Sequence, residues 1–133
     1  MNKADNVDEF YYFRASKSKF IFMIISTENE ENIVIVTLNG RLDTLHFPAV
    51  DKELTSLIDN QEKALVLDCQ HLDYVSSSGL RVLLKALKQM EAAKGRLTLC
   101  HLQPQISQIF KISGFDHLFE IYPGKQEAIA SYL

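Results

Sequence analysis

The sequence predicts an α/β fold with a mostly parallel sheet of four or five strands, an antiparallel hairpin at its N-terminal side and about four helices. Short runs of β-branched and aliphatic residues alternate along the chain with segments of helical hydrophobic periodicity. The first two apolar runs are instead joined by the short polar segment 28–32, which favours a hairpin. Strands that alternate with helices imply right-handed crossovers, and therefore parallel pairing, in the rest of the chain.

Five segments carry the strand signal. The run 33–38 is rich in β-branched residues, and Gly40 is predicted to end it. The run 65–69 is almost continuously apolar, as expected for a central parallel strand that is buried on both faces. The remaining predicted strands are 23–26, 96–100 and 121–122.

Four segments carry the helix signal. Pro48 is suited to open the first helix, because the first turn needs no N–H from that residue. The second helix is predicted to begin near Ser78 or Gly79, and two shorter helices are expected at 104–114 and 126–133. The apolar stripe of the second helix comprises Leu80, Leu83, Leu84, Leu87 and Met90.

The chain of 133 residues is long enough for one domain with a single core. Residues 1–22 mix charges with aromatic residues and show no clear period, so we expect either a flexible arm or an added element that packs through its aromatics. Met23 precedes the first regular strand and is a candidate for the natural start. We therefore divide the chain into an N-terminal arm, 1–22, and a domain, 23–133.

Composition and charge narrow the classes of function. With a net charge of −3 and no dense basic cluster, the chain is not expected to bind nucleic acid directly. The longest apolar run, 20–25, is far shorter than the roughly 20 residues of a membrane helix. Cys69 and Cys100 match neither a redox pair nor a zinc-site spacing, and two buried free thiols suit the reducing cytoplasm.

Three consecutive serines, Ser76, Ser77 and Ser78, stand between a predicted buried strand and an amphipathic helix. The free N–H groups and the positive end of the helix dipole at this position would stabilise a phosphate on one of these hydroxyls. Serine is also a favoured N-cap, worth about 1 kcal/mol over alanine, so the serines alone are equally compatible with helix capping.

Three segments together resemble the STAS family. Residues 75–81, Val-Ser-Ser-Ser-Gly-Leu-Arg, are similar to its signature loop, and 39–43, Asn-Gly-Arg-Leu-Asp, to its earlier Gly-x-Leu-Asp loop. Residues 109–115, Ile-Phe-Lys-Ile-Ser-Gly-Phe, resemble its late helix that ends in a glycine turn. The order and spacing of the three segments fit, and the resemblance covers about 23–133.

The resemblance implies an anti-sigma factor antagonist, which binds an anti-sigma serine kinase when unphosphorylated and so regulates transcription. It implies Ser77 as the phosphoacceptor, with Ser76 and Ser78 as fallback acceptors. The common family loop has an aspartate where this chain has Ser76. A phosphatase that reverses the modification is a further expected partner. The expected partner-binding residues are Asp43, Ser76, Ser78, Gly79, Leu80 and Arg81.

Two other readings stay open at this point. A STAS domain can also serve as an adaptor or scaffold in a non-sigma signalling or lipid-transport complex. An enzyme with a serine nucleophile is disfavoured, because Val75 stands where a Gly-x-Ser-x-Gly elbow needs its first glycine. The histidines are scattered along the chain, and no nucleotide-binding loop is present, so we expect no catalysis, no cofactor and no metal. These histidines are His46, His71, His101 and His117.

Overall fold

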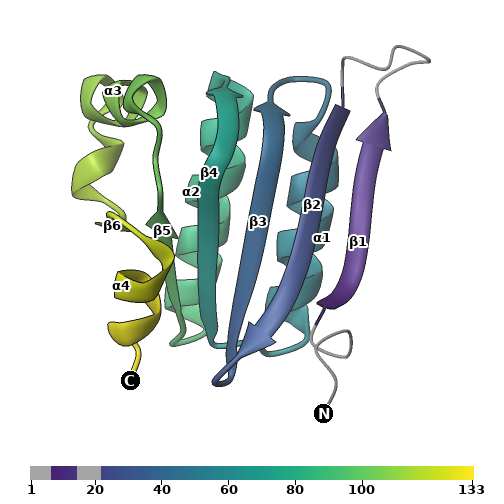
Figure 1. Cartoon of the computed structure of the whole chain (residues 1–133), viewed down its shortest axis with the longest axis vertical. Coiled ribbons are helices and arrows are strands. Elements are labelled where there is room, and N and C mark those ends of the chain that lie inside the picture. The colour runs from purple at the N-terminus through teal and green to yellow at the C-terminus, as the bar shows by residue number, and fades with distance from the viewer. Residues whose placement is uncertain (1–6, 15–21) are drawn as a thin grey trace.

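The computed structural model describes residues 7–14 and 22–133, which form one mixed sheet with helices on both of its faces (Figure 1). In the described part of the chain the sheet has six strands in the order β1-β2-β3-β4-β5-β6. Pairing is antiparallel from β1 to β3 and parallel from β3 to β6. The strands are β1 (Val7–Arg14), β2 (Phe22–Glu30), β3 (Ile33–Leu42), β4 (Ala64–Val75), β5 (Arg96–Cys100) and β6 (Glu120–Tyr122).

Two long helices lie behind the sheet in Figure 1, and a short C-terminal helix lies on the near side beside β5 and β6. The helices are α1 (Phe47–Asp59), α2 (Ser77–Ala92), α3 (Pro104–Ser113) and α4 (Lys125–Ala130), with a 3-10 turn, η2, at Phe115–His117. The predicted α/β class, with its antiparallel hairpin and parallel strands, is confirmed. No helix in the described ranges is both long and apolar enough to cross a membrane.

The sheet has one strand more than the four or five predicted. The additional strand is β1, which pairs with β2 from Val7 opposite Glu28 to Arg14 opposite Phe22. It lies in the segment that we expected to be a flexible arm or an added element. The remainder of that segment, 1–6 and 15–21, lies outside the described residues.

The predicted hairpin is formed by β2 and β3. Its two turn residues, Glu31 and Asn32, have φ values of 57° and 65°. Positive φ at both central residues is the mark of a type I′ turn, which matches the twist of the flanking strands. The strand β3 continues beyond Gly40, contrary to the prediction, because Gly40 takes a φ of 108° at a shift in the register and the pairing resumes up to Leu42.

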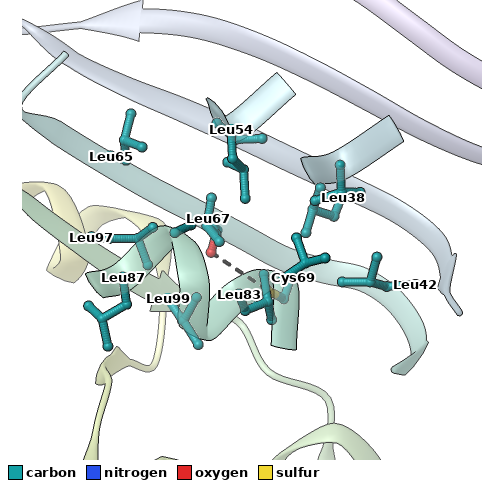
Figure 2. Close-up of a cluster of buried hydrophobic side chains, with 14 of the residues drawn as sticks. Leu38, Leu42, Leu54, Leu65, Leu67, Cys69, Leu83, Leu87, Leu97 and Leu99 are labelled. Carbon is teal, nitrogen blue, oxygen red and sulfur yellow. Dashed lines mark hydrogen bonds between the residues drawn. The ribbon is translucent and has the colours of Figure 1, made fainter. Parts of the chain in front are cut away.

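The core lies on both faces of the sheet, as the alternation along β3 shows. Val34 and Val36 belong to the cluster under α1, α2 and α3, whereas Ile33 and Ile35 belong to the cluster under α4. Figure 2 shows the larger cluster, in which leucines of the strands meet leucines of the two long helices. The labelled members of that cluster are Leu38, Leu42, Leu54, Leu65, Leu67, Cys69, Leu83, Leu87, Leu97 and Leu99.

The two cysteines are free and lie on opposite faces of the sheet. Cys69 belongs to the larger cluster and Cys100 to the smaller one. Burial is the main reason why the pKa of the Cys69 thiol is raised strongly and that of Cys100 is raised to about 12. Both side chains are therefore expected to be thiols rather than thiolates near neutral pH.

Candidate partner-binding and modification site

The two loops that the sequence singled out meet at the carboxyl ends of β3 and β4, which lie side by side at the top of Figure 1. The N–H of Ser76 donates a hydrogen bond of 2.9 Å to the carbonyl oxygen of Leu42. Because Asp43 follows Leu42 directly, this bond fixes the first turn of α2 against the loop that carries Asp43. In open α/β sheets this edge is the usual position of binding sites.

Ser76 is the N-cap of α2. Its backbone is extended, with φ −89° and ψ 173°, and its Oγ accepts a hydrogen bond of 3.1 Å from the N–H of Gly79. Its carbonyl oxygen accepts the N–H of Leu80 at 2.9 Å. The helix therefore begins one residue before the predicted start, and the Ser76 hydroxyl is engaged in capping it.

The other two serines differ in exposure. Ser77 is the first residue of α2, and its side chain is exposed. Ser78 is half-buried, and its Oγ accepts a long hydrogen bond of 3.4 Å from the guanidinium of Arg81. Since the N–H groups of a first helical turn have no acceptor within the helix, Ser77 combines an accessible hydroxyl with backbone donors beside it.

Gly79 is buried and allows α2 to approach the end of β3. A Cβ at this position would lie 2.6 Å from the carbonyl oxygen of Leu42 and 2.7 Å from its Cγ. Gly79 therefore sets the position of the serine loop and does not itself offer a side-chain surface. Leu80 is half-buried against the core, whereas Arg81 is exposed.

Asp43 organises the loop before α1. Its Oδ1 accepts hydrogen bonds from the N–H of Leu45 at 3.2 Å and of His46 at 3.0 Å, and lies 2.6 Å from Nδ1 of the fully buried His46. Burial alone would raise the pKa of the Asp43 carboxyl, but the hydrogen bonds from His46 and Leu45 outweigh it, so the pKa lies below the ordinary value of 3.8. The carboxylate thus holds the loop in shape.

Three residues in or beside this loop, Arg41, Leu45 and Tyr74, were not singled out from the sequence. The guanidinium of Arg41 lies 4.2 Å from the ring centroid of Tyr74, and its Nε lies 3.6 Å from Oδ2 of Asp43. Tyr74 and Leu45 are among the exposed large hydrophobic side chains. Arg41 and Tyr74 are paired across β3 and β4, so only the register of strands longer than predicted brings them together.

Comparison with known proteins gives the family. The STAS domain family model matches residues 25–128, and the chain therefore belongs to the STAS domain family. BtrV of Bordetella bronchiseptica, a candidate anti-sigma factor antagonist, is 34% identical over 110 residues, which cover 83% of this chain and 95% of BtrV.

Solved structures show the same fold. An anti-sigma factor antagonist from Mycobacterium paratuberculosis has a TM-score of 0.77 at 19% identity, covering 87% of this chain and 97% of that protein. The Bacillus cell fate determinant SpoIIAA in its phosphorylated form has a TM-score of 0.65 at 22% identity, covering 82% of this chain and 99% of SpoIIAA.

Proposed function

We propose that the protein is an anti-sigma factor antagonist whose binding to an anti-sigma serine kinase is controlled by phosphorylation of Ser77. The observation that carries the proposal is the placement of Ser77, an exposed hydroxyl on the first residue of α2 beside the Asp43 loop. The chain matches relatives over nearly their whole length, and these relatives are named as anti-sigma factor antagonists. One of them is the anti-sigma F factor antagonist of Paenibacillus polymyxa. The protein would act in the cytoplasm by binding and not by catalysis.

The proposed binding surface contains the exposed side chains around Ser77. Arg81, Tyr74 and Leu45 offer charged, aromatic and aliphatic contacts, and Leu45 lies on the loop that Asp43 holds in shape. Ser76, Ser78, Gly79 and Leu80 would contribute mainly by fixing the helix start against β3.

The switch would be electrostatic. Phosphorylation adds about −1.5 to −2 charges at pH 7 and three acceptor oxygens. In the proposed complex the partner covers Ser77, so a phosphate there would be buried in the interface next to the loop that carries Asp43. Uncompensated charge in an interface costs several kcal/mol, and each 1.4 kcal/mol is a tenfold loss of affinity. A phosphatase would restore the binding form.

Ser76 stands where the common family loop has an aspartate, and its geometry supports a retained loop structure. Aspartate and serine are about equally good N-caps, so the cap observed here preserves the helix start. What this chain lacks is one negative charge next to the proposed acceptor. That difference would alter how the partner is recognised rather than where Ser77 lies.

The test is a titration of the anti-sigma kinase with three forms of the protein. We expect Ser77→Ala to bind like the unphosphorylated protein, and Ser77→Glu to lose on the order of 100-fold in affinity. Ser56→Glu, which places the same charge on an exposed position of α1, is the matched control and should bind normally. Equal affinity of Ser77→Ala and Ser77→Glu for the kinase would refute the switch.

Intact-mass and fragmentation analysis of the protein from its own cells tests the modification itself. A phosphoryl group at Ser77 whose occupancy changes between growth and stress supports the proposal. An unmodified loop under every condition, with capture of receptor-like or membrane-associated proteins instead of a kinase, would replace it with the adaptor function.

A further inference from the structure

We propose that Asp68, Cys100 and His101 form a binding site for Zn²⁺ on the α4 side of the sheet, away from the serine loop. The three side chains offer one oxygen, one sulfur and one nitrogen atom, and these atoms all lie within 4.8 Å of one another. Zinc accepts these three donor types, and in many of its sites three protein ligands leave the fourth position for water.

The sheet register creates this group of donors. Asp68 on β4 is paired with Cys100 on β5, so their side chains leave the same face of the sheet directly opposite each other. His101 follows Cys100 and would point to the other face if the strand continued. Its φ of 59° breaks the extended backbone, and its ring returns to the Asp68 carboxylate.

The distances and burial suit a site that one ion can enter. Nδ1 of His101 lies 3.1 Å from Oδ1 of Asp68, and the same oxygen accepts the N–H of Gln70 at 3.1 Å, which orients the carboxylate. Cys100 is completely buried, the Asp68 side chain is 10% exposed and that of His101 is 33% exposed. An ion would therefore approach past the imidazole and meet the thiol at the bottom of the site.

The donor types also favour a divalent ion of intermediate softness. On binding, the thiol of Cys100 would release its proton to solvent and ligate as a thiolate. One thiolate and one carboxylate would then neutralise the two charges of Zn²⁺. Sulfur ligation disfavours Mg²⁺ and Ca²⁺, which prefer oxygen ligands.

Other histidine–aspartate pairs and the second buried thiol of this chain serve as comparisons for the proposed site. His46 with Asp43, and His117 with Asp116, are also histidine–aspartate pairs, with N–O distances of 2.6 and 3.7 Å. In the described part of the chain only the group at Cys100 gathers three potential ligands. Cys69, the other buried thiol, lies on the opposite face of the sheet.

The experiment is a titration of the metal-free full-length chain with Co²⁺, a spectroscopic substitute for Zn²⁺. We expect saturation at one ion per chain and a thiolate-to-cobalt charge-transfer band in the near ultraviolet, which added Zn²⁺ displaces. Cys100→Ser should abolish the band. Cys69→Ser and His117→Gln, the matched controls, should retain it.

Competition with a zinc-chelating dye gives the affinities. Loss of an outer partner of a metal site costs about 10–100-fold in affinity, so we expect His101→Gln and Asp68→Asn to lose at least 100-fold. Circular dichroism checks that each variant is folded. If Cys100→Ser does not fold, Asp68→Asn, which keeps the size of the side chain, takes its place as the test of the site. Absence of the band in the folded wild-type chain, or its persistence in Cys100→Ser, would overturn the proposal.

Discussion

At the scale of single residues, three chemically identical serines have three different environments. Ser76 is bound into the cap of α2, Ser78 contacts Arg81, and Ser77 is left exposed. The sequence located the helix start to within one or two residues, but each serine is an equally good cap in isolation. The bond from the Ser76 amide to Leu42 selects Ser76 as the cap, and it joins two residues that are far apart in the sequence.

Asp43 illustrates the same limit. The sequence marked it as a partner-binding residue, whereas the structure shows its carboxylate holding the fold of its own loop through Leu45 and His46. Both roles are compatible, because Oδ2 still faces Arg41 at the border of the proposed surface. The buried His46 that completes the pair gave no sequence signal beyond a lone histidine.

The lowered pKa of Asp43 predicts a specific acid sensitivity. A carboxyl whose pKa is depressed on folding contributes stability that is fully present above its unfolded pKa, near 3.8, and that is lost as the pH falls through its folded pKa. We expect Asp43→Ala to lower the free energy of unfolding by about 1–2 kcal/mol at pH 7, because it removes the acceptor of the Leu45 and His46 N–H groups. The difference should shrink below pH 4.

Urea unfolding of the two proteins between pH 3 and 7 measures this effect. Asp59→Ala is the control, because Asp59 is an exposed carboxylate on α1 and should change stability by less than about 0.5 kcal/mol. A constant difference between wild type and Asp43→Ala across the pH range would contradict the prediction.

At the scale of elements, the segments with a clear period were predicted and the irregular ones were not. The strand signal of β4 ends at Cys69, but the strand continues to Val75 because it stays paired with β3 after β5 has ended. Its later part is exposed at Gln70, His71 and Tyr74, so it lacks a buried strand's apolar pattern. The same long-range pairing explains why Asp68 and His101 could not be connected from the sequence.

The contact between α2 and β3 depends on Gly79, whose α-hydrogen faces the backbone of Leu42. Gly79→Ala places a methyl group 2.6 Å from the Leu42 carbonyl oxygen, so the helix start must move away from β3. Overpacking costs about 1–3 kcal/mol, and alanine regains up to about 1 kcal/mol through its helix propensity. We therefore expect the free energy of unfolding to fall by about 1–2 kcal/mol.

Chemical denaturation measures that loss, and Lys88→Ala, at an exposed position of the same helix, is the matched control with a change within about 0.5 kcal/mol. The substitution should also weaken the proposed binding of an anti-sigma kinase beyond its effect on stability, because it displaces Ser77. A Gly79→Ala protein as stable as wild type would show that the helix tolerates a side chain there.

At the scale of the whole molecule, the added strand β1 lies outside the part of the chain that the family model matches. The family match covers 25–128, and the described clusters of core residues draw on β2 to β5, the four α-helices and the segment around Phe119. The strand β1 pairs with β2 alone, at the edge of the sheet. Its sequence gave no strand signal, because four consecutive aromatic residues, 10–13, interrupt any alternation of apolar and polar positions.

We therefore predict that residues 23–133 fold without the preceding segment. The fragment should unfold cooperatively, because every described member of the two core clusters lies within 25–132. It should be less stable than the full chain by a few kcal/mol and should self-associate more strongly, because removal of β1 exposes most of the nine-residue strand β2 as an open edge. Circular dichroism during urea unfolding and sedimentation at several concentrations measure the two effects.

A double proline variant of the full chain, Phe10→Pro with Tyr11→Pro, separates the loss of pairing from the loss of the segment itself. Successive amides of a strand point in opposite directions, so one of the two prolines must remove a hydrogen bond to β2. If β1 only covers the edge, the variant and the fragment should lose similar stability. A fragment without a cooperative transition would instead make β1 part of the fold's minimal core, and the domain would then have to begin at Val7 or earlier.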